Sequence, residues 1–412
     1  MKRISALLLL ALPTLLLLFP AMSVQAQSQP RVRRHPLEVP PGYFASLNAS
    51  PRHLVSNQLS ASTNAAAQAG DPRIVSLPTF TGSFNAGGYA YPYTMAGRAP
   101  RMNQTTVIPT QYIPLSLYFD SYFDGSGNPI TIDATAVTNT ITRSPLFENA
   151  EYATGTTQFV DAQMRAEFWP QVNRSDGNFH VLLARPQTLN AVTIEVPPGS
   201  GVVYQALDGT YFAQIDYDFL LSQLNTLLQT EPVSVNAIPV FLTRNAVFSD
   251  FVNGQPGPDC CIGGLHAALE TGQTGNRIYV QTAVFATALD ANVADAIFED
   301  PGDFADVNAL SHELAETLND PFGDNVTPEY QLPGQAPGVC EDTLEVGDVV
   351  EGLPPDYTEV SSHGLTYHPQ TLGLLQWFEG VQPSNAIGGA YSFSDTSKLT
   401  APFSPCGIQP TE

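Results

Sequence analysis

The stretch SHELAE at residues 311–316 combines a histidine and two glutamates at a spacing that suits metal chemistry. Side chains four residues apart lie one above the other on a helix, so His312 and Glu316 can aim an imidazole nitrogen and a carboxylate at one point. Glu313 lies on the flank of that face. In the zinc-peptidase motif H-E-x-x-H, two histidines bind zinc and the glutamate is the general base. Carboxylate is also a zinc ligand, so H-E-x-x-E predicts a metal site.

A catalytic zinc site needs a third protein ligand and one open position for water. The downstream block LEVGD carries two candidates, Glu345 and Asp348, which follow a turn and a cysteine, and the sequence does not choose between them. His266, on a strand upstream, could supply a further ligand or a contact to one. With a metal in place, Glu313 would accept the proton of the metal-bound water and deliver it to a leaving amine.

The same residues admit a second interpretation. On a helical wheel the polar side chains of the motif lie opposite Val307, Leu314 and Leu318, as they would on a surface helix whose charged side faces water. If the site exists, zinc is the expected metal. Two carboxylates make the site harder and more anionic, so calcium or manganese could take its place. A Gly-rich turn at Asp124 could also bind calcium, although its residues are ordinary turn formers.

Local patterns indicate which elements would position these side chains. A helix is expected from about residue 303 to 319, where Pro321 disfavours its continuation. Its apolar stripe consists of Val307, Leu310, Leu314 and Leu318. Upstream, the pattern predicts a helix at 217–228, a strand at 237–243, and a hairpin of strands 263–270 and 277–286. This order of elements is that of zincin catalytic domains, which is an analogy of order.

The chain divides into four expected segments. Residues 1–26 have a basic start, an apolar run and a small-residue cleavage site, which are typical of a secretory signal peptide. Residues 27–75 are rich in Pro, Ser, Ala and Gln, and are expected to be a disordered linker or a pro-segment. Residues 76–210 read as a β-rich part, and residues 211–412 as a zincin-like part. The fold class is therefore expected to be α+β.

Acidic residues dominate the charge of the chain. It holds 16 Lys and Arg against 39 Asp and Glu, and without residues 1–26, which hold two basic residues and no acid, the balance is 14 − 39 = −25. Such a field repels nucleic acid and anionic membranes and attracts cations or basic substrates, and it also keeps an exported protein in solution. No segment after residue 26 is long and apolar enough for stable membrane insertion.

Four cysteines predict two disulfides in a chain exported to an oxidising compartment. Adjacent cysteines bond each other only with strain. The expected pairing therefore joins Cys260 and Cys261 each to one of Cys340 and Cys406, which would tie the hairpin to the C-terminal part.

The blocks SHELAETLNDP, CCIGGLHAAL and LEVGD together resemble a group of secreted bacterial proteins, and are similar to the plant phosphate-induced, Exordium-like proteins. YPYTMAGRAP and QMRAEFW resemble the same bacterial sequences, so the likeness covers residues 76–406. This resemblance implies a zincin-like metal site at His312, Glu316 and the LEVGD block, with Glu313 as the catalytic carboxylate. One departure is that Cys340 precedes the acidic block, and no cysteine follows it closely.

Motif, order of elements and resemblance together favour a secreted metal-dependent hydrolase, and within that class a zinc peptidase acting on a peptide or protein. The alternative is a non-catalytic extracellular binding or cell-surface protein, with a structural metal or none, whose partner would be an extracellular polymer. A third interpretation is a calcium-stabilised, β-rich adhesion module.

Overall fold

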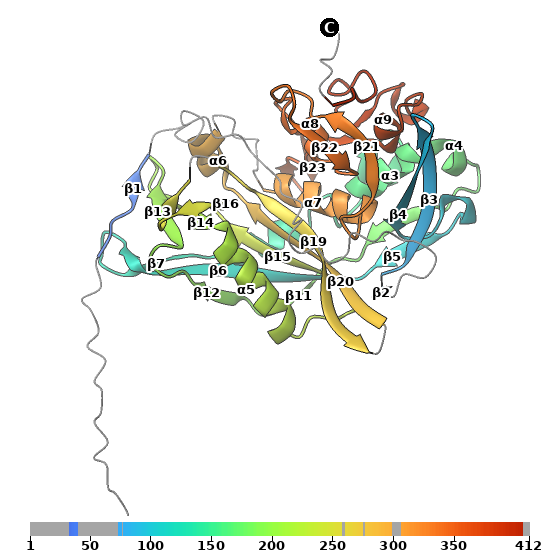
Figure 1. Cartoon of the computed structure of the whole chain (residues 1–412). Helices are drawn as coiled ribbons and strands as arrows, with labels where there is room; N and C mark the ends of the chain where they lie inside the picture. The colour runs from blue at the N-terminus through green and yellow to red at the C-terminus, as the bar shows by residue number, and fades with distance from the viewer. Residues whose placement is uncertain are drawn as a thin grey trace, which may run out of the picture.

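The computed structural model describes residues 33–39, 73–75, 77–257, 260–274, 277–298 and 306–406. The expected signal peptide lies outside these residues. The fold is α+β, as the sequence predicts: long strands cross the molecule and helices pack against them (Figure 1). Within the described residues, no helix has the length and apolar character needed to cross a membrane.

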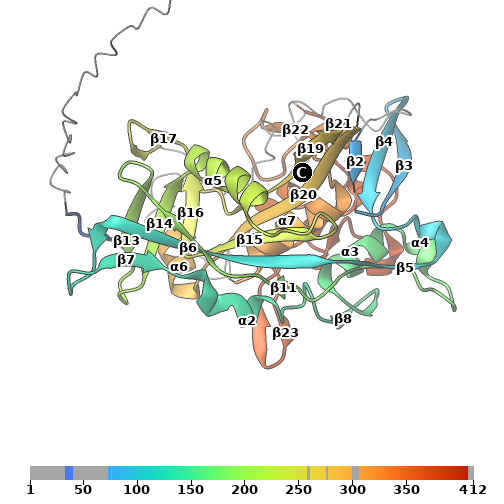
Figure 2. The same cartoon turned by 90° about the horizontal axis from the view of Figure 1, so that it is seen from below.

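The largest sheet has the strand order β11-β6-β15-β20-β19, with β12 and β7 paired to β6 and β2 paired to β20. Its strands are β2 (Arg73–Val75), β6 (Thr110–Phe123), β7 (Pro129–Ile132), β11 (Gln187–Thr188), β12 (Val192–Glu195), β15 (Ile238–Arg244), β19 (Gly264–Thr274) and β20 (Arg277–Ala288). β6, β15 and β20 run parallel, and β19 returns antiparallel to β20 as the expected hairpin. Figure 2 shows β6 extending along the length of the molecule. Strands from both sides of residue 210 therefore share one sheet.

A smaller sheet contains β1 (Leu37–Glu38), β13 (Gly201–Gln205), β14 (Tyr211–Asp216) and β16 (Ala246–Ser249). Seven strand pairs complete the β structure of the described residues: β3 (Thr79–Ala86) with β4 (Tyr89–Ala96), β5 (Thr105–Ile108) with β10 (His180–Leu183), β8 (Ala150–Tyr152) with β9 (Gly155–Thr157), β17 (Phe251–Val252) with β18 (Gln255–Pro256), β21 (Val326–Gln331) with β22 (Cys340–Thr343), β23 (Val360–Ser362) with β24 (Leu365–Tyr367), and β25 (Leu372–Gly373) with β26 (Ser392–Phe393). β1 and β2 fall inside the expected linker 27–75 and pair with the body of the protein; most of that range lies outside the described residues.

The α-helices are α2 (Thr138–Ile141), α3 (Phe159–Glu167), α4 (Trp169–Val172), α5 (Tyr217–Thr230), α6 (Ala291–Phe298), α7 (Asn308–Asn319), α8 (Asp348–Glu351) and α9 (Leu375–Glu379). Short 3-10 helices occur at η2 (Pro100–Met102), η3 (Ala134–Val137) and η4 (Asn385–Ile387). α7 is the expected motif helix. It begins at Asn308, and residues 303–305 of the expected range lie outside the described part of the chain. It ends before Pro321, as the sequence predicts.

The β19–β20 hairpin separates two apolar cores. Successive side chains on a strand point to opposite faces of the sheet. On β20, Val284 and Ala286 belong to the core that includes the leucines of α7, while Ala283 and Phe285 belong to the core that includes the leucines of α5. His266 on β19 pairs in register with Val284, so its side chain lies on the α7 side of the sheet. The alternation of the hairpin thus brings a histidine to the motif helix.

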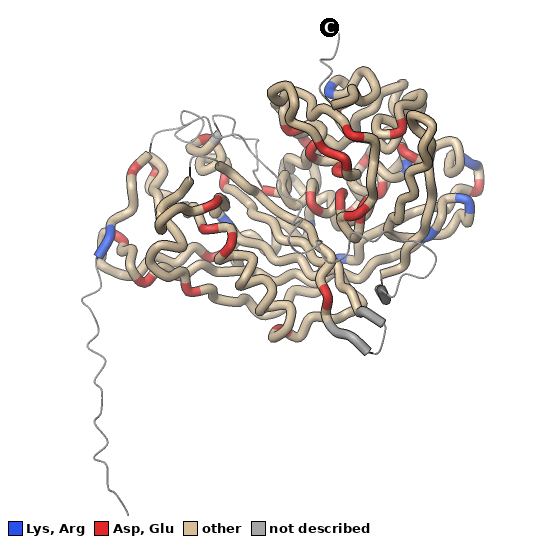
Figure 3. The backbone as a smooth tube through the Cα atoms, viewed as in Figure 1, with Lys and Arg blue, Asp and Glu red and all other residues tan. Residues whose placement is uncertain are grey.

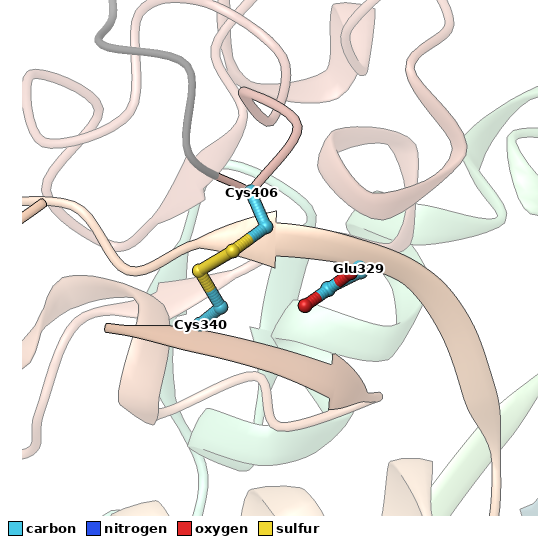
Figure 4. A group of neighbouring side chains, drawn as sticks. All are labelled: Glu329, Cys340 and Cys406. Atoms are coloured by element: carbon cyan, nitrogen blue, oxygen red, sulfur yellow. A yellow bond between two sulfur atoms is a disulfide. The ribbon is translucent and has the colours of Figure 1, made fainter. Parts of the chain in front are cut away.

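The disulfides differ from the expected pairing. Cys340 bonds Cys406, and Cys260 bonds its neighbour Cys261. The reason lies in the strand pairing: β22 brings Cys340 opposite Gln331 of β21, and the tail meets the same strand through the bridge between Tyr330 and Pro405. Figure 4 shows Cys340 and Cys406 joined beside Glu329. The expectation that the hairpin cysteines reach this pair is therefore wrong.

Candidate metal centre

α7 is enclosed by protein on every side. All residues from Asn308 to Asn319 are buried, including the polar side of the helix. The apolar stripe Val307, Leu310, Leu314 and Leu318 packs in the core as predicted. His312, at 0% exposed, and Glu313, at 1%, are as buried as the leucines. The interpretation of a charged face in water is therefore wrong, because residues 345–370 fold over that face.

The His312 ring is held by contacts on both nitrogens. Its Nδ1 lies 2.9 Å from Oε1 of Gln370, an acceptor that fixes the proton on Nδ1. Its Nε2 then faces carboxylates, with Oε2 of Glu316 at 2.9 Å and Oδ1 of Asp348 at 3.3 Å. Metal-binding histidines commonly donate their second N–H to a fixed acceptor in this way. His312, Glu316 and Asp348 thus present three donor atoms that lie within 4.8 Å of one another.

Gln370 is placed by the backbone around the centre. Its Nε2 donates to the carbonyl of Gly347 over 2.9 Å, and its backbone N–H donates to Oγ of Ser311 over 2.8 Å. Ser311 in turn donates to the carbonyl of Asn308. The serine of the motif therefore anchors the segment that orients the histidine beside it. Sequence reasoning missed Gln370, because no motif surrounds it and its partners are distant in the chain.

The two downstream candidates occupy different places. Asp348, the first residue of α8, lies beside Nε2 of His312, and Glu351 lies 3.8 Å from Nδ1 of the same ring. Glu345 instead lies beside His266, with its Oε2 4.0 Å from Nε2 of that ring. Glu345 is wholly buried, and within the described residues neither of its oxygens accepts a hydrogen bond.

Glu313 and His266 form a second group around Glu316. Nδ1 of His266 lies 3.4 Å from Oε2 of Glu313 and 3.4 Å from Oε2 of Glu316. These three residues also offer donor atoms within 4.8 Å of one another. His266, which the sequence suggested as a ligand or a contact to one, therefore joins the same centre as the motif.

Two glycines allow the backbone to approach the centre closely. A Cβ on Gly347 would lie 2.3 Å from Nδ1 of His312, and a Cβ on Gly264 would lie 2.5 Å from Oε1 of Glu313. Atoms cannot approach that closely, so any other residue at either position would displace a side chain of the centre. Gly347 is the glycine of LEVGD and lies against His312. Gly264 is a glycine of CCIGGLHAAL on β19 and lies against Glu313.

Burial and neighbouring carboxylates shift the pKa values of several groups in the centre. Burial lowers the pKa of His312, but Glu316 and Asp348 more than offset it, so that pKa lies well above its ordinary value. Burial also lowers the pKa of His266, but Glu313 and Glu316 more than offset this effect, so the pKa lies well above its ordinary value. Burial, and then the charge of Glu316, raise the pKa of Glu345 well above its usual range. A cation entering the centre would compete with protons for these groups.

The donor set fits a divalent cation. Donor atoms that share a zinc ion at about 2.0–2.2 Å lie roughly 2.8–3.6 Å apart, depending on coordination number. The separations from Nε2 of His312 to Glu316 and Asp348 are 2.9 and 3.3 Å. A buried carboxylate without a donor, such as Glu345, also requires a proton or a nearby positive charge. Figure 3 shows acidic residues gathered where α7, β22 and α8 meet.

A further group of possible ligands, Glu329, Cys340 and Cys406, is not a comparable site. Both sulfurs are consumed by the disulfide, and a thiolate is the form of cysteine that binds metal. Glu329 is exposed beside them (Figure 4). This group therefore acts as a covalent link rather than as a ligand set.

An aromatic cleft of about 350 Å³ lies between β4 and the turn that follows α7. Tyr89, Tyr91 and Tyr93 of β4 line it, together with Asp324 and Asn325 from the turn that follows α7. The Asn325 side chain bonds Thr94 of β4 and the carbonyl of Asn319, the last residue of α7. The Asn325 carbonyl accepts a hydrogen bond from Leu344, the residue before Glu345. The wall of the cleft is thus tied directly to the segment that carries Glu345.

Comparisons of the chain with models of protein families, with curated proteins and with solved structures give no match.

Proposed function

We propose that this protein is a metal-dependent hydrolase, and within that class a zinc peptidase. The supporting observation is the convergence of His312, Glu316 and Asp348 around one point, with Glu313 at its side. The order of helix, strand, hairpin and motif helix agrees with a zincin-like part, and the edge strand β19 antiparallel to β20 is part of that pattern. The sequence resemblance to HELAE-containing secreted proteins points in the same direction.

Asp348 is the third ligand in this proposal, and Glu345 is not. Asp348 Oδ1 lies on the same side of the His312 ring as Glu316, whereas Glu345 faces His266. Gln370 keeps the proton on Nδ1 of His312, so Nε2 presents its lone pair to the metal. His312, Glu316 and Asp348 supply one imidazole and two carboxylates, a set that zinc accepts and that manganese or calcium could also use.

A zinc ion held there would supply Lewis-acid chemistry toward a substrate carbonyl. Glu313 would perform the proton transfers. Its carboxylate would accept a proton from the attacking water and deliver it to the leaving nitrogen. Gly264, packed against the Glu313 side chain, restricts where that carboxylate can move. The tyrosine-lined cleft, which is linked to α7 and to the segment of Glu345 through Asn325, offers a place for substrate side chains.

We also propose that the protein is exported from the cytoplasm. The N-terminal signal-like segment and the two disulfides both suit a protein that works outside the cytoplasm. The expected substrate is therefore an extracellular peptide or protein.

The test combines metal analysis with a cleavage assay. The purified chain should contain about one tightly held zinc ion and should cleave casein or a peptide library. Glu313→Gln should retain the metal and lose at least about a hundredfold in cleavage rate, since general-base catalysis contributes on that order. Glu270→Gln, an exposed glutamate on the same hairpin, is the matched control and should behave like the wild type. Cleavage by Glu313→Gln at the wild-type rate, or cleavage that continues after the metal is removed by a chelator, would contradict the proposal.

One observation favours a second candidate, a non-catalytic extracellular protein with a structural cation. The metal donors are enclosed, and Asp348, with a side chain 10% exposed, is the most accessible of the three. Structural metal sites are closed, whereas catalytic sites keep an open position. In this case the purified chain would hold metal and cleave no substrate, and Glu313→Gln would change only its thermal stability.

A further inference from the structure

Two histidines flank Glu316 with the same construction. Nε2 of His312 faces Glu316 and Asp348, and its other nitrogen faces Gln370. Nδ1 of His266 faces Glu316 and Glu313, and its other nitrogen faces Glu345. Each ring therefore has one nitrogen among carboxylates that could bind a cation, and its other nitrogen faces an oxygen that can accept a hydrogen bond. Glu316 Oε2 is common to both sets.

The groups behind His266 are buried without hydrogen-bond partners. Within the described residues, neither oxygen of Glu345 accepts a hydrogen bond, and Nε2 of His266 makes none. Both side chains are at most 1% exposed, so solvent does not satisfy them. The 4.0 Å between Nε2 and Oε2 of Glu345 is an ion-pair distance that a small movement would convert to a hydrogen bond. That contact would keep the proton on Nε2 and leave the Nδ1 lone pair toward Glu313 and Glu316.

We propose that His266, Glu313 and Glu316 form a second divalent-cation site, which shares Glu316 with the site at His312. The 3.4 Å separations from Nδ1 to both carboxylates equal those expected for donors around one ion. Glu345 orients the ring of His266, as Gln370 orients that of His312. The carboxylates and imidazoles of the two sites together form a centre for two cations.

The second cation binds more weakly than the first. It shares a carboxylate with a cation that is already bound, and two positive ions a few ångströms apart repel each other. Its site also uses Glu313, the residue to which the proposed function gives the proton transfers. A carboxylate that coordinates a cation cannot serve as a general base. This inference rests on the proposed function, and it predicts that hydrolysis rises with the first equivalent of metal and falls as the second site fills.

The alternative occupant of the second site is a proton. A protonated His266 would donate toward Glu313 and Glu316 through Nδ1 and toward Glu345 through Nε2. The chain would then bind one cation, and excess metal would not inhibit. Direct measurement of stoichiometry and of metal–metal coupling separates the two occupants.

Manganese is the probe, because two Mn²⁺ ions bridged by one carboxylate give a spin-coupled electron paramagnetic resonance spectrum. The metal-free full chain is dialysed against Mn²⁺, and bound ions per chain are counted. Wild type should bind two ions and show the coupled signal. His266→Gln retains an N–H toward Glu345 and lacks the nitrogen that faces Glu313. It should bind one ion with an uncoupled signal.

Glu345→Gln is the second variant, and circular dichroism shows whether each variant is folded. Loss of the acceptor behind His266 should weaken the second ion at least tenfold, as outer contacts of metal ligands do, and leave the first unchanged. Saturation of the wild type at one ion, or two uncoupled ions, would overturn the second site while leaving the proposed function intact. Two coupled ions without hydrolysis at any metal concentration would instead overturn the proposed function alone.

Discussion

At the scale of single residues, the proton on Nδ1 of His312 decides what its other nitrogen can do. Gln370 Oε1, 2.9 Å away, accepts a hydrogen bond from that N–H, and the amide nitrogen of Gln370 donates to the carbonyl of Gly347. The glutamine is thereby held with its oxygen toward the ring. In the proposed metal site, the role of Gln370 is to orient His312 rather than to bind the metal, and this role can be tested apart from catalysis.

Gln370→Leu should lower metal affinity by about 10–100-fold, the effect usual for outer contacts of ligating histidines. The side chain of leucine has similar size but accepts no hydrogen bond, so the ring loses its fixed orientation. Affinity is measured by competition with a chelator of known strength. Gln229→Leu, an exposed change on α5, is the control. Unchanged affinity in Gln370→Leu would show that the hydrogen bond does not orient a ligand.

At the scale of elements, α3 and α9 bring a second pair of carboxylates together away from the candidate centre. Burial raises the pKa of Glu379, at the end of α9, to about 7. Burial, and to a smaller extent the charge of Glu379, also raise the pKa of Glu167, although hydrogen bonds from Leu375 and Gln163 oppose this. The packing of α9 on α3 therefore favours protonated carboxyl groups.

This packing makes stability depend on pH. A carboxyl group whose pKa rises from 4.5 to about 7 on folding binds more protons in the folded state across that interval, so stability falls as pH rises through it. Glu379→Gln removes the titrating group. The variant should unfold at a higher urea concentration than the wild type at pH 8, and this advantage should shrink at pH 5.

Urea unfolding at both pH values checks this, with the exposed Glu359→Gln as the matched control. A Glu379→Gln protein that is less stable than the wild type at pH 8 would contradict the assignment.

At the scale of the whole molecule, one sheet contains strands from both halves of the chain, and one disulfide joins Cys340 to Cys406. Cys340 and Cys406 are 66 residues apart, and the segment between them includes Asp348 and Gln370. Constraining a loop of this length stabilises a protein by about 4 kcal/mol in the chain-entropy model. The disulfide therefore lowers the conformational entropy of the segment that encloses α7 when the protein is unfolded.

Reductant should lower the urea midpoint of the wild type, but should have little further effect on the C340S/C406S variant, which has already lost the loop constraint. The C260S/C261S variant is the control. This variant lacks only the bond between the neighbouring residues Cys260 and Cys261 and keeps the bond between Cys340 and Cys406, so reductant should shift its midpoint as much as that of the wild type. If reductant lowered the urea midpoint of C340S/C406S as much as that of the wild type, the bond between Cys340 and Cys406 would not be the one that stabilises the protein.

Much of the local structure could be predicted from the sequence. Leu310, Leu314 and Leu318 recur at helical spacing, and the helix occurs where they predict it. The hairpin of β19 and β20 also forms as expected, with β19 continuing to Thr274 and β20 beginning at Arg277. Burial of the polar side of α7 could not be predicted, because an amphipathic pattern has the same form whether a helix faces water or a second layer of protein.

By itself, the sequence determined the helix with its His-Glu-Glu face, the hairpin that carries His266, and an acidic chain with paired cysteines. These features depend on neighbours along the chain, whose spacing is written in local periodicity. Only the tertiary structure decided that Asp348 lies beside Nε2 of His312, that Glu345 faces His266, and that Cys340 bonds Cys406. Such contacts join distant positions, 58 residues apart for His312 and Gln370, and no local pattern specifies which distant segments meet.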